Sequence, residues 1–287
     1  MTAEQALESC EYFANDRVTL YHGDCIEVMR SLPDNSVDSV VTSPPYAMQR
    51  ASTYGGIDEK EYPEWTVGVF AEIERILKPE GSIMWNISPN VRDGQLVDYV
   101  LKMRLALRAN GWFEHDELVW VKPDKMPTGQ RTWPKRSWES IFWYSRTKSP
   151  FANATANGNL ISEKTKAAAS LRVNAFRGRD ARLGWNHLGK GKGKMGEYSR
   201  SKNWISIAVS SVDRELDHPA PYPIELAKWM MRFNTPAQGV VLDPFAGSGT
   251  TVQAALMEGF NVIAIEMTDE YLPLIVERIE RYGEMLF

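Results

Sequence analysis

Two short segments of the chain combine residues that could do chemistry, and each is connected to a stretch typical of a strand. The first is Ser43-Pro44-Pro45-Tyr46, which comes shortly after the predicted strand 37–41 (VDSVV). Two successive prolines fix φ and remove two backbone donors, so rigid carbonyls point outward. With a hydroxyl before them and an aromatic ring after them, they form a small site for accepting hydrogen bonds and stacking. A bare turn is the alternative, but open α/β sheets bind ligands at the carboxyl ends of their strands.

The second segment runs from Val240 to Thr251 (VVLDPFAGSGTT) and joins an apolar strand to a helix through a glycine-rich loop. Such a loop lets a ligand approach the backbone N–H groups at a helix N-terminus. It is not G-x-G-x-x-G, and it lacks the lysine of a phosphate-binding P-loop. About 23 residues after Asp243, Glu266 ends the next predicted strand, where an acidic side chain binds ribose hydroxyls. Taken separately, the loop could be a structural turn and Glu266 a surface carboxylate. Together, the two features indicate a nucleoside cofactor without a polyphosphate.

Strands and helices alternate around both segments, and this alternation predicts an α/β fold with a mainly parallel sheet and helices on both faces. The expected strands are 18–21, 37–41, 82–87, 112–121, 139–144, 240–242 and 261–265. The expected helices are 62–77, 96–107, 224–233, 250–258 and 270–282. The run Lys78-Pro79-Glu80-Gly81 is a stop signal for the first of these helices.

Charge is strongly segregated along the chain. The formal net charge is −4, yet residues 122–202 hold 18 Lys and Arg against five Asp and Glu, and the rest holds 15 against 32. From about residue 145 to 202 the sequence has no sustained apolar period, which predicts an insertion rather than a second core. A basic segment on an acidic protein indicates a polyanion partner, with nucleic acid as the first candidate and a merely solvated face as the alternative.

Composition excludes several classes of protein. With 43% hydrophobic and 24% charged residues, the chain is neither collagen-like, disordered nor coiled-coil. No apolar run approaches the ~18 residues of a membrane span and the N-terminus does not resemble a signal peptide, so we expect no membrane partner and a cytoplasmic location. Cys10 and Cys25 cannot build a disulfide framework, and the four histidines are too scattered for a metal site, so no metal is expected.

The motifs resemble those of the β class of amino-methylating DNA methyltransferases, which use S-adenosylmethionine. Ser-Pro-Pro-Tyr at residues 43–46 resembles the catalytic motif of that family, and DPFAGSGTT at 243–251 resembles its cofactor motif. The order of catalytic motif, variable region and cofactor motif is similar to the β class. The segment HPAPYP at 218–223 resembles a cofactor-flanking motif of that class, although Phe is more usual at the position of Tyr222, and Gly-Asp-Cys at 23–25 matches the family's opening.

The resemblance implies a Rossmann-like methyltransferase fold and a division of the chain into three parts. Residues 1–146 would form the catalytic half of the methyltransferase domain, and 203–287 the cofactor-binding half. Between them, 147–202 would be a basic target-recognition insertion. The residues expected to contact DNA are Arg131, Lys135, Arg136, Arg172, Arg177, Arg179, Arg182, Lys190, Lys192, Lys194, Arg200 and Lys202.

In the implied cofactor site, Phe245 and the turn 247–250 would cradle the methionine part, with Asp243 near its ammonium. Glu266 would bind the ribose hydroxyls and Asp24 the adenine amino group, with a turn residue after Gly23 as the alternative for Asp24. Carboxylates suit a cofactor that carries sulfonium and ammonium cations. The full implied set is Asp24, Cys25, His218, Pro219, Asp243, Pro244, Phe245, Gly247, Ser248, Gly249, Thr250 and Glu266.

The implied catalytic residues are Ser43, Pro44, Pro45 and Tyr46. The exocyclic amine of a base is a poor nucleophile because its lone pair is delocalised into the ring. The Ser43 hydroxyl and the Pro44 carbonyl could accept its two N–H bonds and free that lone pair, while Tyr46 stacks on the flipped base. Methylation of a ring carbon needs a cysteine nucleophile, and neither cysteine has that setting.

The resulting prediction is a site-specific DNA methyltransferase that modifies the N4 amine of cytosine, because Ser is typical of such enzymes at position 43. Adenine-N6 methylation on the same scaffold is the alternative. A non-catalytic nucleic-acid binder and an RNA or small-molecule methyltransferase are less favoured by the intact motifs and the basic segment. The expected partner is double-stranded DNA. A homodimer and a cognate restriction endonuclease are further partners compatible with the resemblance, although the sequence itself indicates neither.

Overall fold

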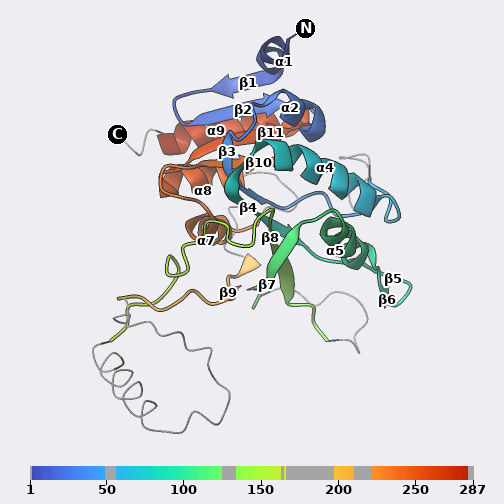
Figure 1. Ribbon diagram of the computed structural model, residues 1–287, viewed down its shortest axis with the longest axis vertical. Coiled ribbons are helices and arrows are strands. Elements are labelled where there is room, and N and C mark those ends of the chain that lie inside the picture. The colour runs from blue at the N-terminus through green and yellow to red at the C-terminus, as the bar shows by residue number, and fades with distance from the viewer. Residues whose placement is uncertain are drawn as a thin grey trace. The chain divides into compact units, whose positions relative to one another are not determined.

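The computed structural model describes residues 2–48, 56–124, 134–162, 165, 197–209 and 222–283. The chain divides into two compact units, of which the larger joins Met1–Asn153 to Asn203–Phe287 (Figure 1). The smaller unit, Ala154–Lys202, overlaps the expected insertion 147–202. In its described residues, Leu160 forms an antiparallel bridge with Tyr198, and the Ser201 N–H donates to the Ala154 carbonyl at 2.6 Å. The two ends of the smaller unit thus pair with each other.

The described residues of the larger unit form a nine-stranded sheet in the order β1-β2-β11-β10-β3-β4-β8-β7-β9. The strands are β1 (Glu11–Ala14), β2 (Val18–His22), β3 (Val37–Thr42), β4 (Leu77–Ile87), β7 (Phe113–Val121), β8 (Trp138–Ser145), β9 (Trp204–Ser206), β10 (Val240–Asp243) and β11 (Asn261–Glu266). A separate hairpin pairs β5 (Val91–Arg92) with β6 (Gln95–Leu96). The helices are α1 (Ala3–Cys10), α2 (Cys25–Ser31), α4 (Tyr62–Ile76), α5 (Tyr99–Ala109), α7 (Ile224–Asn234), α8 (Thr250–Glu258) and α9 (Leu272–Gly283), with a 3₁₀ turn, η3 (Asp269–Tyr271).

Helices cover both faces of this sheet, as Figure 1 shows for α4 and α5 on one side and α7, α8 and α9 on the other. Alternate residues of one strand serve the two faces, because side chains along a strand point in opposite directions. In β3, Val40 packs with α2, α4 and α5, whereas Val41 packs with α7, α8 and α9. The continuous apolar runs of the inner strands follow from this burial on both faces.

The five strands β2, β11, β10, β3 and β4 are parallel, so their carboxyl ends share one edge of the sheet. From β3 the chain crosses through α4 to β4 on one side. From β10 it crosses through α8 to β11 on the other side. The loops after β3 and β10 therefore diverge at a topological switch point, which is where open α/β sheets bind ligands.

The predicted elements are largely found, with three differences. The helix expected at 96–107 begins only at Tyr99, and Leu96 lies in β6 with 62% of its surface exposed. The helix expected at 270–282 begins at Leu272 after the 3₁₀ turn. The stop signal after α4 does end the helix, but β4 starts at once with Leu77.

This early start of β4 is possible because the strand bulges. Leu77 pairs with Val37 and Ser82 with Ser39, so the intervening residues, including Pro79, lie outside the ladder where a missing N–H is tolerated. A Cβ on Gly81 would lie 2.8 Å from the Asp38 carbonyl oxygen, which explains glycine at this close approach. Within the described residues, no helix combines the length and the apolar composition that crossing a membrane requires.

Candidate active site

The Ser43–Tyr46 segment leaves the carboxyl end of β3 and is held by hydrogen bonds on both sides of Pro44. The Ser43 hydroxyl donates to the Asn86 carbonyl in β4 at 3.2 Å. The Tyr62 hydroxyl in α4 donates to the Pro45 carbonyl at 2.9 Å. Asn90 Nδ2 donates to the Ala47 carbonyl, just after the segment, at 2.7 Å. Because these contacts and the two prolines fix the backbone, the direction of the Pro44 carbonyl is fixed as well.

Tyr46 is half-buried, with its hydroxyl at the buried end. This hydroxyl donates to Glu139 Oε2 in β8 at 3.1 Å. Burial, followed by the negative charge of Glu139, raises the pKa of Tyr46 well above its ordinary value. The hydroxyl therefore keeps its proton and remains a donor.

Asp243 ends β10 and lies buried beside the end of β3, with 1% of its surface exposed. Its carboxylate accepts hydrogen bonds from the Thr42 hydroxyl at 2.6 Å, from the Phe245 N–H at 3.1 Å and from the Thr251 hydroxyl. Burial raises the pKa of Asp243 to about 6, although these three donors act in the opposite direction. The carboxylate expected near a cofactor ammonium is thus already engaged in joining β3, the glycine-rich loop and α8.

Glu266, at the end of β11, holds the glycine-rich loop from the other side. One of its oxygens accepts from the Gly247 N–H at 2.7 Å and the other from the Thr268 N–H at 2.9 Å. Burial raises the pKa of Glu266 above its ordinary value. Each carboxylate oxygen has two lone pairs, so Glu266 can hold the loop and still accept from ribose hydroxyls.

The turn before α8 depends on glycine. Gly249 has φ +83°, and a Cβ there would lie 3.2–3.3 Å from atoms of Ile275. Gly249 is also the N-cap of α8, and as a glycine it offers no capping side chain. The first N–H groups of a helix need acceptors, and the helix dipole favours a negative group there. This end of α8 therefore suits a ligand carboxylate.

Two observations test whether the loop suits the methionine part of S-adenosylmethionine. Ser248 is 2% exposed, and its Oγ has no hydrogen-bond partner among the described residues. The half-buried Phe245 ring lies 5.7 Å from the Trp65 ring and 5.9 Å from the Trp85 ring, measured between centroids. The loop thus offers a buried hydroxyl without a partner among the described residues, an aromatic ring and a helix start that no side chain caps. These features fit a ligand with one carboxylate and one apolar, cationic part.

Two expected cofactor residues, Asp24 for the adenine amino group and Cys25, follow the end of β2, beside Glu266. Asp24 is exposed and caps α2, since its Oδ1 accepts from the N–H groups of Ile26 and Glu27 at 2.9 and 3.2 Å. Asp24 therefore has a structural role in the turn, as the alternative to cofactor binding expected. Its other oxygen, Oδ2, is the atom that could contact a ligand. Cys25 is buried, and its burial raises the pKa of its thiol. The expected cofactor residues His218 and Pro219 lie outside the described residues.

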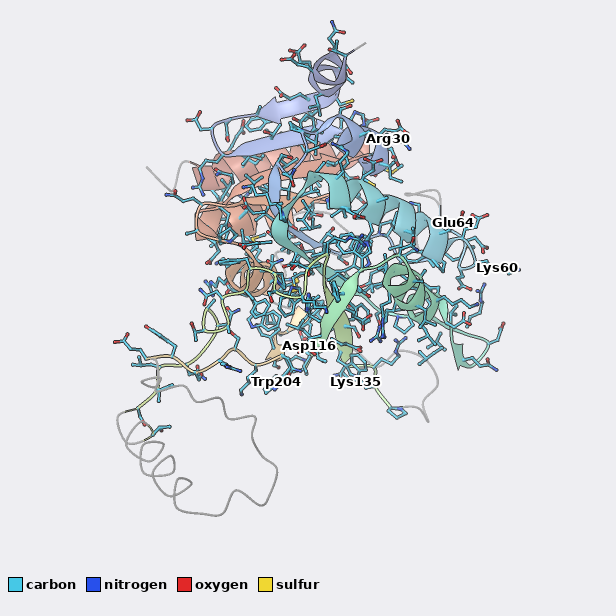
Figure 2. All side chains as sticks on the ribbon, viewed as in Figure 1. Arg30, Lys60, Glu64, Asp116, Lys135 and Trp204 are labelled. Atoms are coloured by element: carbon cyan, nitrogen blue, oxygen red, sulfur yellow. The ribbon has the colours of Figure 1, made fainter. Side chains whose placement is uncertain are left out.

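Few of the expected DNA contacts fall on described residues. Lys135 is exposed and is labelled in Figure 2 near the end of the sheet that carries β7 and β9. Arg136 is half-buried and donates to the Ser88 hydroxyl and the Pro89 carbonyl at 3.2 and 2.9 Å, so it supports the loop after β4. Arg200 and Lys202 are exposed in the smaller unit. The others, Arg131, Arg172, Arg177, Arg179, Arg182, Lys190, Lys192 and Lys194, lie outside the described residues.

Residues 37–277 match the protein family N6_N4_Mtase, described as DNA methylase. The chain belongs to this family. Its resemblance to amino-methylating DNA methyltransferases is thus confirmed. The match spans the strand before Ser43, the glycine-rich loop and Glu266, so one family accounts for all three parts of the site.

Named relatives of this DNA methyltransferase cover most of the chain. The type II methyltransferase M.PvuII of Proteus hauseri is 27% identical over 273 residues, which is 88% of this chain and 81% of the relative. The DNA adenine methyltransferase YhdJ of Escherichia coli (strain K12) is 25% identical and aligns with 93% of this chain and 84% of its own.

Solved structures confirm the predicted fold. That of the PvuII DNA methyltransferase, described as cytosine-N4-specific, has a TM-score of 0.71 at 22% identity, covering 96% of this chain and 93% of that one. The putative DNA modification methylase TTHA0409 from Thermus thermophilus, complexed with S-adenosyl-L-methionine, has a TM-score of 0.57 at 23% identity and covers 93% and 95%.

Several residues of the methyltransferase site were not expected from the sequence. Asn86, Tyr62 and Asn90 hold the Ser43–Tyr46 segment, and Glu139 holds its aromatic ring. The only sequence signal for Asn86 is a polar residue inside the apolar strand SIMWNI. Nothing in the spacing of the others relates them to Ser43, because each comes from a different element.

Proposed function

We propose that this DNA methyltransferase transfers the methyl group of S-adenosylmethionine to the exocyclic N4 amine of a flipped cytosine in double-stranded DNA. The observation that carries the proposal is the 2.6 Å hydrogen bond between Thr42 and Asp243. It places the Ser43–Tyr46 segment and the glycine-rich loop side by side at the switch point of the sheet. A base held by the first and a methyl donor held by the second would meet there.

The Ser43–Tyr46 segment can hold an amine from two directions. The Ser43 hydroxyl donates its proton to the Asn86 carbonyl and is also hydrogen-bonded to the Tyr46 hydroxyl. A hydroxyl oxygen has two lone pairs, so one would remain to accept an N–H bond. The Pro44 carbonyl supplies the second acceptor in a backbone fixed by its neighbours. With both N–H bonds accepted, the amine nitrogen is drawn towards a tetrahedral geometry and its lone pair is freed. The half-buried Tyr46 ring would supply the stacking face for a base extruded from the duplex.

The cofactor would be held by Phe245, the turn 247–250 and Glu266, with Asp24 at the adenine end. When bound, S-adenosylmethionine supplies an electrophilic methyl group on a sulfonium. The Ser248 hydroxyl and the start of α8 suit its carboxylate, and the carboxylates of Glu266 and Asp243 give the loop a negative environment that suits its cations. The role of Asp243 is to hold this loop against β3 rather than to provide a free carboxylate.

The choice of cytosine depends on Ser43. A neutral hydroxyl with one carbonyl suffices to orient a pyrimidine amine, and the cytosine-N4-specific PvuII enzyme has a similar fold. Adenine-N6 methylation is the second candidate, because a relative named as an adenine methyltransferase aligns with 93% of the chain. Mass spectrometry of nucleosides from DNA methylated in vitro distinguishes the two, since N4-methylcytosine and N6-methyladenine differ in mass.

The basic segment 122–202 would bind the DNA, with 147–202 acting as the target-recognition insertion. Its excess positive charge supports phosphate binding, and only a few of its side chains would read base edges. The homodimer, the cognate restriction endonuclease and the cytoplasmic location stay predictions from the sequence.

A further inference from the structure

A buried ion pair lies at the end of the β7–β8 hairpin. Lys122 directly follows β7, Glu139 lies in β8, and Lys122 Nζ contacts Glu139 Oε1. The two residues are only 6% and 9% exposed. The ammonium of Lys122 also lies 3.9 Å from the centroid of the Trp120 ring, which gives the cation a second favourable contact.

Such a pair is weak as a stabilising device. Removing two charges from water costs free energy that their attraction often fails to offset, and a well-packed apolar pair can be equally or more stable. Stability alone therefore does not explain why the Lys122–Glu139 pair is buried. The contact that distinguishes this pair is made by the second oxygen of Glu139, which accepts the Tyr46 hydroxyl at 3.1 Å.

We propose that Glu139, neutralised by Lys122, is a positioning residue that fixes the orientation of the Tyr46 ring. The proposal rests on the proposed function, in which Tyr46 stacks on the flipped base. Pro44 and Pro45 fix the backbone end of Tyr46, and Glu139 holds the opposite end, the hydroxyl on the ring atom farthest from the backbone. A ring held at both ends keeps one stacking plane, and an ionised acceptor makes a stronger hydrogen bond than a neutral one.

Lys122 has a defined part in this arrangement. Lys122 places its charge directly on Glu139 Oε1, and a buried carboxylate needs such a partner because burying an unpaired charge is costly. The pair thus places an acceptor that is paired with a cation at the hydroxyl end of the Tyr46 ring, and it presents little net charge to a bound base. Positioning of this kind changes the rate of reaction and not the affinity for the cofactor, because the glycine-rich loop is held by other residues.

The hairpin offers a matched control. Tyr144 in β8 donates its hydroxyl to Glu114 Oε2 at 3.1 Å, and Glu114 pairs with Arg104 at 2.5 Å. This is the same arrangement of tyrosine, carboxylate and cation, but it makes no contact with the Ser43–Tyr46 segment among the described residues. Tyr144→Phe therefore reports what the loss of such a hydroxyl does to stability alone.

The test is a double-mutant cycle in the full-length protein. One arm is Tyr46→Phe, which keeps the ring and removes the hydroxyl. The other arm is Lys122→Met with Glu139→Leu, which replaces the pair by apolar residues and leaves no unpaired buried charge. The readouts are the single-turnover rate of methyl transfer to unmethylated phage DNA, S-adenosylmethionine affinity by calorimetry and the midpoint of urea unfolding.

We expect each arm to slow methyl transfer by roughly tenfold, as misplaced reacting groups do, and the combination to be no slower than either arm. Cofactor affinity should stay within about twofold of the wild type in every variant, and Tyr144→Phe should leave the rate unchanged. Glu139→Gln with Lys122→Met, which keeps an acceptor, should recover part of the rate.

Two results would overturn the proposal. The first is a wild-type rate for Tyr46→Phe, and the second is rate losses that simply multiply when the arms are combined. The variant Tyr46→Ala shows whether such a result overturns only the positioning role of Glu139 or also the proposed function. If Tyr46→Ala is slow while Tyr46→Phe is fast, the stacking role stands and the positioning role of Glu139 is wrong. If Tyr46→Ala is as fast as the wild type, the stacking role itself is wrong.

Discussion

Thr42 donates its hydroxyl to Asp243 Oδ1 across 2.6 Å, and this bond joins the carboxyl ends of the two central strands β3 and β10. The residue after Thr42 begins the Ser-Pro-Pro-Tyr segment, and the residue after Asp243 begins the glycine-rich loop. The Asp243 carboxylate also accepts from Thr251 at the start of α8, whose hydroxyl is in turn hydrogen-bonded to Tyr222. A displacement of one motif is therefore transmitted to the other.

Thr42→Val should weaken both functions at once. Valine keeps the shape of threonine, but the Asp243 carboxylate loses a donor in a buried place, which costs about 1–3 kcal/mol. We expect a lower unfolding free energy, a slower rate of methyl transfer and weaker cofactor binding. Thr66→Val is the control, because the Thr66 hydroxyl is also buried but donates to a carbonyl of its own helix, that of Tyr62. Equal losses of activity in the two variants would contradict a coupling role for Thr42.

Asp243→Asn should remove one component of the pH dependence of stability. Because the folded pKa of Asp243 is raised to about 6, the folded protein retains a proton that the unfolded chain has lost. The unfolding free energy should therefore fall as pH rises from about 4 to about 6, by about 2 kcal/mol more in the wild type than in Asp243→Asn. Urea unfolding at several pH values measures this difference. Parallel pH profiles for the two proteins would show that Asp243 is ionised normally.

Glu266→Gln should weaken cofactor binding more than activity at saturating cofactor. Glutamine has one acceptor oxygen for the N–H groups of Gly247 and Thr268, so one edge of the loop loses its support. We expect a loss of about 1–3 kcal/mol in calorimetric affinity for S-adenosylmethionine. Glu270→Gln, at an exposed residue nearby, is the control. Unchanged affinity in Glu266→Gln would contradict its place in the cofactor site.

Binding to DNA should depend on the lysines at 190, 192 and 194. Counterion release predicts that the slope of log affinity against log salt becomes less steep by about 0.9 for each phosphate that the protein no longer neutralises. Replacing Lys190, Lys192 and Lys194 by Gln should therefore lower the slope on every sequence tested. Replacing Lys60, Lys102 and Arg108, which lie outside the basic segment, by Gln is the control of equal charge. Identical slopes in the two triple variants would contradict the assignment of the basic segment.

The fold was predictable because the apolar strands and the glycine-rich turn are local patterns. The strand before Ser43 and the unit from Val240 to Glu266 appear in the structure close to their expected bounds. Early elements were missed where the local pattern is weak: α2 has only seven residues, and β1 has a mostly exposed surface. In the same way, β4 extends beyond its apolar core through a bulge that no periodicity reveals.

The supporting residues of the site could not be predicted, because they depend on the register of distant strands. Glu139 meets Tyr46 only because β8 pairs with β4 in one particular register, and Tyr62 reaches Pro45 only because α4 packs across β3. The role of Asp243 in joining β3 to the start of α8 could not be predicted either, because its partners Thr42 and Thr251 lie 201 and eight residues away. Sequence showed which groups could do chemistry, whereas tertiary packing decides which of them are engaged with the protein itself.

Identification of the methylated nucleoside shows which base the protein modifies. Unmethylated DNA would be incubated with the protein and S-adenosylmethionine, digested to nucleosides and separated by liquid chromatography with mass spectrometric detection. We expect N4-methylcytosine, with its formation abolished or greatly slowed in Tyr46→Ala. Formation of N6-methyladenine without N4-methylcytosine would contradict the argument from Ser43.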